Sequence, residues 1–508
     1  MSERHTADLK RLTKNTIYLY VRSFLVMLVA LFTTRVILQN LGVEDYGIYN
    51  VVSSFVTMFS FISSSLSVTI SRFLSIELAQ NKTENVKKVY SSSLISLAVI
   101  ALILAVIVEL IGVPFLNLKM TIPAERLSAA NWVLQFSIIT LVINVFSISY
   151  EAVIVSYEKM SIYAYISILD VVLKLLIAYV IAVTGGDKLI VYSFLLMMQA
   201  AIIRVVYGCF CRYKFEHCRL DIKFLEKSLV RRITTLSGWD VLGAASNIIK
   251  SSGTNIIFNL FLGPVVNAAN GISEQVRSAL WKFSGGFLTA LRPQIVKAYS
   301  SDERQYLFNL INRGTKFSSY LMIILSAPII VEIDYILNLW LHDVPQYTAG
   351  FVVLVIVLII GEGTIAYPSN AAMMATGNIK KNQIIASVLQ LMNLPLTYII
   401  IRIGYSPYWA YIISICIANV LCLVRTIILN QLIGYSTRDF YLKVYLPIYI
   451  VFAVSLLIPY LFHLFLSAGI LRLIIVSLIG VIWSLLVIMI FGCNKIERSL
   501  IVNFIRRK

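Results

Sequence analysis

Long apolar runs alternate with short polar connections along almost the whole chain. An apolar stretch of about 20 residues is long enough to cross the hydrocarbon core of a bilayer as a helix. By this criterion the pattern predicts about fourteen transmembrane helices. They are expected near residues 13–39, 47–74, 89–113, 131–155, 162–184, 189–211, 237–261, 271–298, 313–338, 349–372, 383–402, 407–430, 445–467 and 472–492.

The composition supports this pattern. Of the 508 residues, 59% are hydrophobic and only 13% are charged, which is more apolar surface than a soluble core of this size buries. We therefore expect an all-α polytopic membrane protein. No signal-peptide cleavage site follows the first apolar run, so that run is expected to remain as the first span. The six cysteines show neither disulfide nor metal-ligand spacing, and no metal or cofactor is expected.

Basic residues are distributed unevenly between the two sides of the predicted bundle. Loops on the side of the N-terminus contain about 27 Lys and Arg, against about 4 in the loops opposite. Because basic loops stay in the cytoplasm, both termini are expected there. The formal net charge of +18 follows mostly from this orientation and from attraction to anionic lipid, so no nucleic-acid partner is needed to explain it.

A weak internal repeat divides the chain. Asn40-Leu41-Gly42 ends the first span and Phe261-Leu262-Gly263 ends the seventh, and each is followed by a long helix with scattered polar residues. The repeat predicts two pseudo-symmetric lobes of six helices, residues 1–220 and 221–436, with substrate at their interface. Residues 437–508 then contain two C-terminal helices and a cytoplasmic tail.

Positively charged residues occur inside several predicted spans, where a charge costs at least about 2.5 kcal/mol on insertion scales. Few acidic residues accompany them, so they predict a water-filled, electropositive lumen and hence a transporter of an anionic substrate. Arg277 and Arg292 lie about 60° apart around an ideal helix and can face one groove, whereas Lys282 lies about 140° from Arg277. The predicted substrate-binding cations are Arg22, Arg35, Lys250, Arg277, Lys282 and Arg292.

Structural roles are the alternative for several charged residues. The two arginines of the first span lie near its ends, where their side chains can snorkel to the interface. Glu274 precedes Arg277 by one turn, and Asp170 precedes Lys174 by four residues, so each pair is expected to neutralise itself. Lys250 has no acidic residue three or four positions away, so its partner must come from another helix, water or substrate.

Polar residues recur on one face of the second predicted span in steps of three and four. They are Asn50, Ser53, Thr57, Ser60, Ser64, Ser67 and Ser71. Small hydroxyls also serve close helix packing, but so many in register favour the polar wall of a lumen. In the seventh span Asn247 and Thr254 share a face with Lys250 and extend this wall.

Carboxylates at membrane depth are candidates for binding a coupling ion, and Asp170, Glu274 and Glu362 are assigned this role. Others, such as Glu332 and Asp334, lie near span ends and are expected to be solvated. No nucleotide-binding, metal-binding or catalytic-triad motif is found. No outward loop exceeds roughly 17 residues, too short for a catalytic domain, so the chain is not expected to be an enzyme.

Two motifs occupy corresponding positions of the repeat: TRVILQNLGVEDYGIYN at residues 34–50 and NLFLGPVVNAANGI at residues 259–272. With the number of spans, they resemble the polysaccharide-exporter branch of the multidrug, oligosaccharidyl-lipid and polysaccharide flippase superfamily, the lipid-linked O-unit flippases. The resemblance implies two six-helix bundles around a V-shaped central cavity. It also implies that lumen cations hold a pyrophosphate and that the last two helices form a groove for a lipid tail.

The function implied by this resemblance is transport of an undecaprenyl-pyrophosphate-linked oligosaccharide across the bacterial cytoplasmic (inner) membrane, by alternating access, for O-antigen (lipopolysaccharide) or capsule assembly. Implied partners are this substrate, membrane lipids, Na+ or H+, and a polysaccharide polymerase. Two alternatives stay open. An ion-coupled small-molecule exporter of the same superfamily is expected to bind organic cations through acidic residues, and a polymerase or ligase usually has a large external loop.

Overall fold

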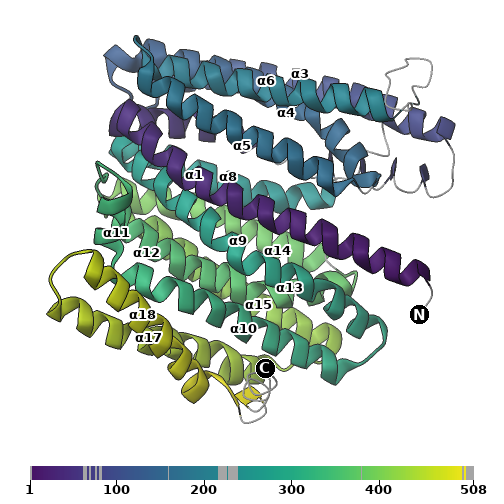
Figure 1. The fold of residues 1–508 in the computed structure, drawn as a ribbon, viewed down its shortest axis with the longest axis vertical. Helices are drawn as coiled ribbons and strands as arrows, with labels where there is room; N and C mark the ends of the chain where they lie inside the picture. Colours follow the sequence, from purple (N-terminus) through teal and green to yellow (C-terminus); the bar gives the residue numbers. More distant parts are fainter. Residues whose placement is uncertain are drawn as a thin grey trace. The chain divides into compact units, whose positions relative to one another are not determined.

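The computed structural model is helical throughout the long segments that it describes (Figure 1). It describes residues 3–60, 66–67, 70–71, 73–74, 77–78, 83–157, 159–215, 226, 238–378, 380–494 and 497–498. Side chains are described over the same ranges except at 3–25, 83, 160, 238–244, 283–284, 286–287, 289–290 and 293. These helices confirm the all-α class predicted from the hydrophobic pattern. A chain in lipid forms helices because its backbone polar groups have no water to bond and must be satisfied within each helix.

The chain forms two compact units. The first unit contains Met1–Ile272 with Gln390–Gly404, and the second contains Ser273–Leu389 with Tyr405–Lys508. The division falls inside two helices, which therefore contribute to both units. They are α9 (Pro264–Ser300) and α14 (Lys380–Arg402).

The other helices of the first unit follow the predicted spans closely. They are α1 (Glu3–Thr57) with the short η1 (Met58–Ser60), α3 (Thr83–Leu118), η2 (Ala124–Arg126), α4 (Leu127–Ser156), α5 (Met160–Val183), α6 (Lys188–Lys214) and α8 (Gly238–Leu262). Helix α4 packs against α3 and α6, and α1 packs against α4, α5 and α8. Fully buried apolar residues such as Ile48, Leu97 and Leu134 form the core between α1, α3 and α4.

The second unit contains the later helices. They are α10 (Arg304–Val331), α11 (Ile333–Trp340), α12 (Thr348–Leu358), η4 (Ile359–Ile365), α13 (Ala366–Ala375), α15 (Tyr408–Ile433), α16 (Thr437–Phe440), η5 (Tyr441–Tyr445), α17 (Leu446–Phe465), α18 (Ile470–Val487) and η6 (Ile488–Gly492). The π-helical η4 joins α12 to α13 in one span. Helices α17 and α18, yellow in Figure 1, lie side by side and both pack against α10.

Eleven of the described helices are long and apolar enough to cross a membrane, so the chain is a multi-pass membrane protein. One of these spans, Val26–Ser60, covers part of the first predicted span and the start of the second. Helices α8 and α9 occupy the ranges predicted for the seventh and eighth spans but are not among the eleven. The count of fourteen therefore stays a prediction.

A glycine with positive φ breaks the helix at each of the two corresponding sequence motifs. Gly42 has φ 81° and ψ 168° inside α1, and Gly263 has φ 79° between α8 and α9. A Cβ atom would meet nothing within 4 Å at either position, so the backbone conformation rather than crowding requires glycine. Pro264 then begins α9, where its missing N–H interrupts no helical hydrogen bond. Both breaks support the sequence correspondence predicted around these glycines.

Arg126 forms hydrogen bonds that join three segments of the first unit, around residues 45, 126 and 187. Its guanidinium donates to Asp45 through Nε at 2.7 Å and to Asp187 through both terminal nitrogens at 2.7 and 3.0 Å. Asp187 also caps α6 by accepting bonds from the N–H groups of Leu189 and Ile190. Burial raises the pKa of Asp187, but its bonds with Arg126 and with these N–H groups outweigh burial and hold the pKa below its usual value.

Candidate functional site

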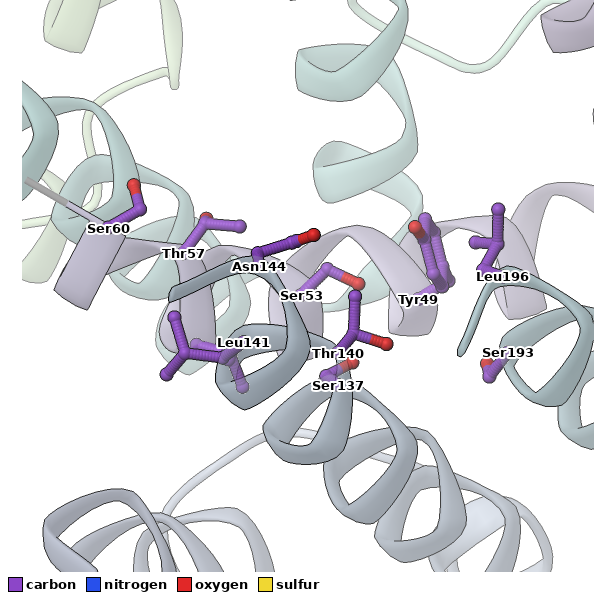
Figure 2. Close-up of a pocket in the computed structure, with 11 residues that line it drawn as sticks. Tyr49, Ser53, Thr57, Ser60, Ser137, Thr140, Leu141, Asn144, Ser193 and Leu196 are labelled. Carbon is purple, nitrogen blue, oxygen red and sulfur yellow. The ribbon is translucent and has the colours of Figure 1, made fainter. Parts of the chain in front are cut away.

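A cavity of about 230 Å³, lined by apolar groups and by several hydroxyl-bearing side chains, lies within the first unit (Figure 2). Its walls come from α1 with η1, from α4 and from α6. The residues that line it are Tyr49, Ser53, Val56, Thr57, Ser60, Ser137, Thr140, Leu141, Asn144, Ser193 and Leu196. None of the described lining residues carries a charge, and most of the polar ones among them have a hydroxyl group.

One wall of the cavity is the polar stripe of the second predicted span. Ser53, Thr57 and Ser60 of that stripe line the cavity, and Tyr49 adds an aromatic ring one turn earlier. The Tyr49 ring packs edge-on against Tyr192 of α6, with ring centroids 4.8 Å apart. This part of the stripe thus faces a cavity, the kind of environment that its helical spacing favours.

The facing wall comes from α4 and is missed by the sequence analysis. Ser137, Thr140 and Asn144 follow steps of three and four and therefore share one helical face. Figure 2 shows these residues across the cavity from Ser53 and Thr57 of α1. The signal for Ser137, Thr140 and Asn144 is present in the sequence, because their spacing in the fourth predicted span is the same as that of the polar stripe in the second.

The polar groups of the lining can both accept and donate hydrogen bonds. Thr57, Thr140 and Ser193 each donate to a backbone carbonyl three or four residues earlier, at 3.2, 2.7 and 2.9 Å. Such a bond uses the hydroxyl hydrogen but leaves the oxygen able to accept. The Asn144 side chain is exposed, and its amide offers both donors and an acceptor. This set suits a ligand that carries several hydroxyl groups.

The remaining residues predicted for the polar wall lie elsewhere. Asn50 donates to the carbonyl four residues earlier at 2.7 Å and packs against Gly271, where a Cβ atom would lie 2.5 Å from the Asn50 side chain. Thr254 likewise donates to the carbonyl four residues earlier, at 2.8 Å. Asn247 is exposed on α8, and Ser64 lies outside the described residues. Asn50, Asn247 and Thr254 are not among the described residues that line the cavity.

The predicted cations of the first unit differ in burial. Lys250, on α8, keeps only 8% of its surface exposed. Arg35, on α1, is exposed, and the side chain of Arg22 lies outside the described part of the chain. Of these two cations with described side chains, Lys250 is therefore the buried one.

The second unit contains the other three predicted cations. Nε of Arg277 donates to the Glu274 carboxylate at 2.6 Å, so the predicted pairing within α9 is confirmed. The Arg277 side chain keeps 40% of its surface exposed, and the bond through Nε leaves its two terminal nitrogens for a further ligand. Lys282 is half-buried and Arg292 is exposed.

The carboxylates assigned to a coupling ion all have basic partners. Asp170 accepts a bond from Lys174 at 2.8 Å, which confirms that predicted pair. Glu362, in the π-helical η4, interacts electrostatically with Arg277 and Arg425. Among the described residues no three or more His, Cys, Asp or Glu side chains are grouped to hold a metal ion. An ion-coupling role for these carboxylates stays a prediction.

The expectation that Glu332 is solvated is wrong. Its side chain is fully buried, and it accepts bonds from Arg472 at 2.9 and 3.1 Å and faces Nδ1 of His463 at 2.8 Å. The reason is that α17 and α18, which carry these two partners, pack against α10 and cover its end.

Two further basic residues in the predicted spans interact with side chains that are close in space but distant in the sequence. Arg204 lies over the ring of Tyr150, 4.0 Å from its centroid. Lys316 pairs with the buried Glu497 at 3.3 Å. A basic residue inside a span is thus not by itself a sign of a binding site, and the partners of each cation decide its role.

Four buried asparagines join α1, α8 and α9 within the first unit; they are Asn255, Asn259, Asn267 and Asn270. The Asn255 amide donates to the carbonyl of Asn50 at 3.1 Å and to the Ser54 hydroxyl at 2.7 Å. Its oxygen accepts from Asn267 at 2.7 Å and from Asn270 at 3.0 Å. Every hydrogen-bonding group of the Asn255 side chain is used, so α1 is fixed beside α8 and α9.

Residues 12–299 match the family described as "Polysaccharide biosynthesis protein". No curated protein matches the sequence at a significant level.

Several solved structures share the fold. One is described as "Lipid II flippase MurJ, inward closed conformation"; it is 15% identical with a TM-score of 0.66, and the match covers 95% of this chain and 99% of that one. A multidrug resistance MATE family transporter of the MOP superfamily matches in its inward-facing conformation, with 14% identity, a TM-score of 0.58, and coverage of 83% and 94%. Its outward-facing conformation matches with 13% identity, a TM-score of 0.61, and coverage of 83% and 96%. The resemblance noted from the sequence motifs is confirmed at the level of this superfamily and its fold.

Proposed function

This chain belongs to the polysaccharide biosynthesis protein family, and from that premise we propose that it moves an undecaprenyl-pyrophosphate-linked oligosaccharide across a membrane. Transport proceeds by alternating access, with the substrate held between two lobes. The cargo is a repeat unit for a surface polysaccharide, either O-antigen or capsule. The chain acts as a transporter and catalyses no covalent step.

The Arg277 guanidinium is the observation that carries this proposal. Glu274 holds it through Nε at 2.6 Å, which fixes the plane of the guanidinium on a helix predicted to cross the membrane. The two terminal nitrogens then form a fork that matches two phosphate oxygens. We assign the pyrophosphate to Arg277, and we propose that Lys250, which is buried in α8, contributes positive charge along the transport path.

The cavity of the first unit favours a sugar cargo over the organic cations expected for a small-molecule exporter. An organic cation taken out of water needs a carboxylate partner to offset its desolvation. The residues that line the cavity include no carboxylate, and they supply hydroxyl groups, one amide and a tyrosine ring instead. This lining is therefore poorly matched to a drug-like cation and well matched to a sugar.

The cellular setting of the proposal follows from the basic loops. We place the protein in the bacterial cytoplasmic membrane with both termini in the cytoplasm, because the basic loops lie on that side. A gradient of Na+ or H+ is proposed as the driving force, and a polysaccharide polymerase is the proposed acceptor of the exported unit.

The test is surface polysaccharide in cells that depend on this protein. We expect Lys250→Ala and Arg277→Ala each to abolish surface polymer while the protein stays inserted and abundant, because each change removes a positive charge from the proposed path of the pyrophosphate. The matched control is Lys443→Ala, since Lys443 is 72% exposed and its pair with Asp439 adds little. Surface polymer at the wild-type level in both cation variants would eliminate the proposed mechanism.

A further inference from the structure

The described lining of the cavity in the first unit indicates a specific kind of ligand. We propose that this cavity is a subsite for one uncharged sugar residue of the transported oligosaccharide, an inference that rests on the proposed function. The cavity has a volume of about 230 Å³, several times the roughly 30 Å³ that one water molecule occupies in the liquid. This space suits a ligand of the size of one sugar ring.

The lining combines the two surfaces that a sugar ring presents. Hydroxyl groups around the ring need donors and acceptors, which Ser137, Thr140 and Asn144 supply from α4 and Ser53 supplies from α1. The C–H faces of the ring need apolar contact, which Tyr49 and three aliphatic side chains provide. These aliphatic residues are Val56, Leu141 and Leu196.

Other occupants fit this lining less well. A phosphate or carboxylate would meet no cation among the described lining residues, and an ammonium group would meet no carboxylate, so neither would recover the cost of its desolvation there. A lipid chain would offer no hydrogen-bonding partner to the exposed Asn144 amide, and none to the hydroxyl oxygens that remain able to accept. A neutral ligand with many hydroxyl groups satisfies both the polar and the apolar parts of the surface.

The walls are held in place before any ligand binds. Ser54, adjacent to the lining residue Ser53, accepts a bond from the buried Asn255 at 2.7 Å, which fixes this part of α1. Thr140 and Ser193 are oriented by bonds to their own helices at 2.7 and 2.9 Å. A preformed site loses less conformational entropy on binding, which favours selective recognition.

The experiment compares two lipids that differ only in sugar. Binding of undecaprenyl pyrophosphate, and of the same lipid carrying a short neutral oligosaccharide, is measured on the full-length protein in lipid nanodiscs. Wild-type protein should bind the sugar-bearing lipid more tightly. Thr140→Val and Asn144→Leu should each lower affinity for that lipid by about 2- to 12-fold, the loss of one hydrogen bond, and leave affinity for the sugar-free lipid unchanged.

Controls separate this inference from the proposed function. Thr184→Val is the matched control: Thr184 is partly exposed, lies outside the cavity, and donates to the carbonyl four residues earlier as Thr140 does. This variant should change neither affinity. Arg277→Ala should lower both affinities by the same factor. If Arg277→Ala does so but the cavity variants leave the ratio of the two affinities unchanged, the sugar subsite is overturned alone. If wild-type protein binds neither lipid, the proposed function falls and the subsite falls with it.

Discussion

Asn255 illustrates how single polar residues organise this membrane protein. It is 2% exposed, and its amide makes four hydrogen bonds to residues of α1 and α9. An amide buried in a membrane protein cannot form hydrogen bonds with water. Burying it is therefore costly unless protein groups satisfy all of its donors and acceptors, as they do for Asn255. It fixes α1 beside α8 and α9 close to the sugar subsite.

Replacing Asn255 by Leu should destabilise the protein by about 2–4 kcal/mol. Each of the four lost hydrogen bonds contributes about 0.5–1.5 kcal/mol, and bonds between membrane helices lie near the lower end of that range. Thermal unfolding of purified protein in detergent measures the loss. Asn338→Leu is the control, because Asn338 is exposed and bonds only within its own helix, to the carbonyl of Asp334. An unchanged melting temperature for Asn255→Leu would contradict this role.

At the scale of single residues, spacing predicts only part of the site. Steps of three and four place Ser53 and Thr57 on one face, and the structure puts both in a cavity. The same spacing also selects Asn50, which instead packs at a helix crossing against Gly271. Periodicity shows which residues share a face, but it does not say whether another helix or a cavity meets that face.

The all-helical class and the positions of most described helices could be predicted from the sequence. Apolar runs long enough to cross a bilayer leave the backbone no alternative to a helix. The break at Gly42 and its counterpart at Gly263 were placed correctly because both motifs carry glycine where φ is positive. Partners far apart in the chain were not predictable, as with Lys316 and Glu497, because hydrophobic pattern says nothing about which distant helices meet.

The last two long helices, α17 and α18, are attached to the second unit by a buried ionic group. Glu332 at the end of α10 is fully buried and bonds to Arg472 of α18 and faces His463 of α17. Removing one partner of such a group leaves an uncompensated charge, which costs more than the pair itself contributes.

Glu332→Ala should therefore destabilise the second unit by about 3–5 kcal/mol, because Arg472 is left buried without its carboxylate. The expected readout is a lower melting temperature together with easier proteolysis between α17 and α18. Asp439→Asn serves as control, since Asp439 is 53% exposed and is paired with Lys443, which is 72% exposed. Wild-type melting and protease resistance for Glu332→Ala would show that packing alone holds these helices.

For the whole molecule, the account divides recognition between two kinds of chemistry. In the proposed mechanism, cations on membrane helices hold a pyrophosphate, the cavity of the first unit takes a sugar residue, and the isoprenoid tail stays in lipid throughout. Substrate that engages both parts would lower the free energy of the transition between inward- and outward-facing states, since a ligand shifts that equilibrium by its differential affinity for the two states.

Transport in a purified system tests the central claim most directly. The measurement is the appearance of a defined undecaprenyl-pyrophosphate oligosaccharide on the far side of liposomes that contain the protein, with and without an imposed Na+ or H+ gradient. We predict translocation by wild-type protein and its loss in Arg277→Ala. Translocation by Arg277→Ala at the wild-type rate, or none by correctly inserted wild-type protein under any gradient, would contradict the account.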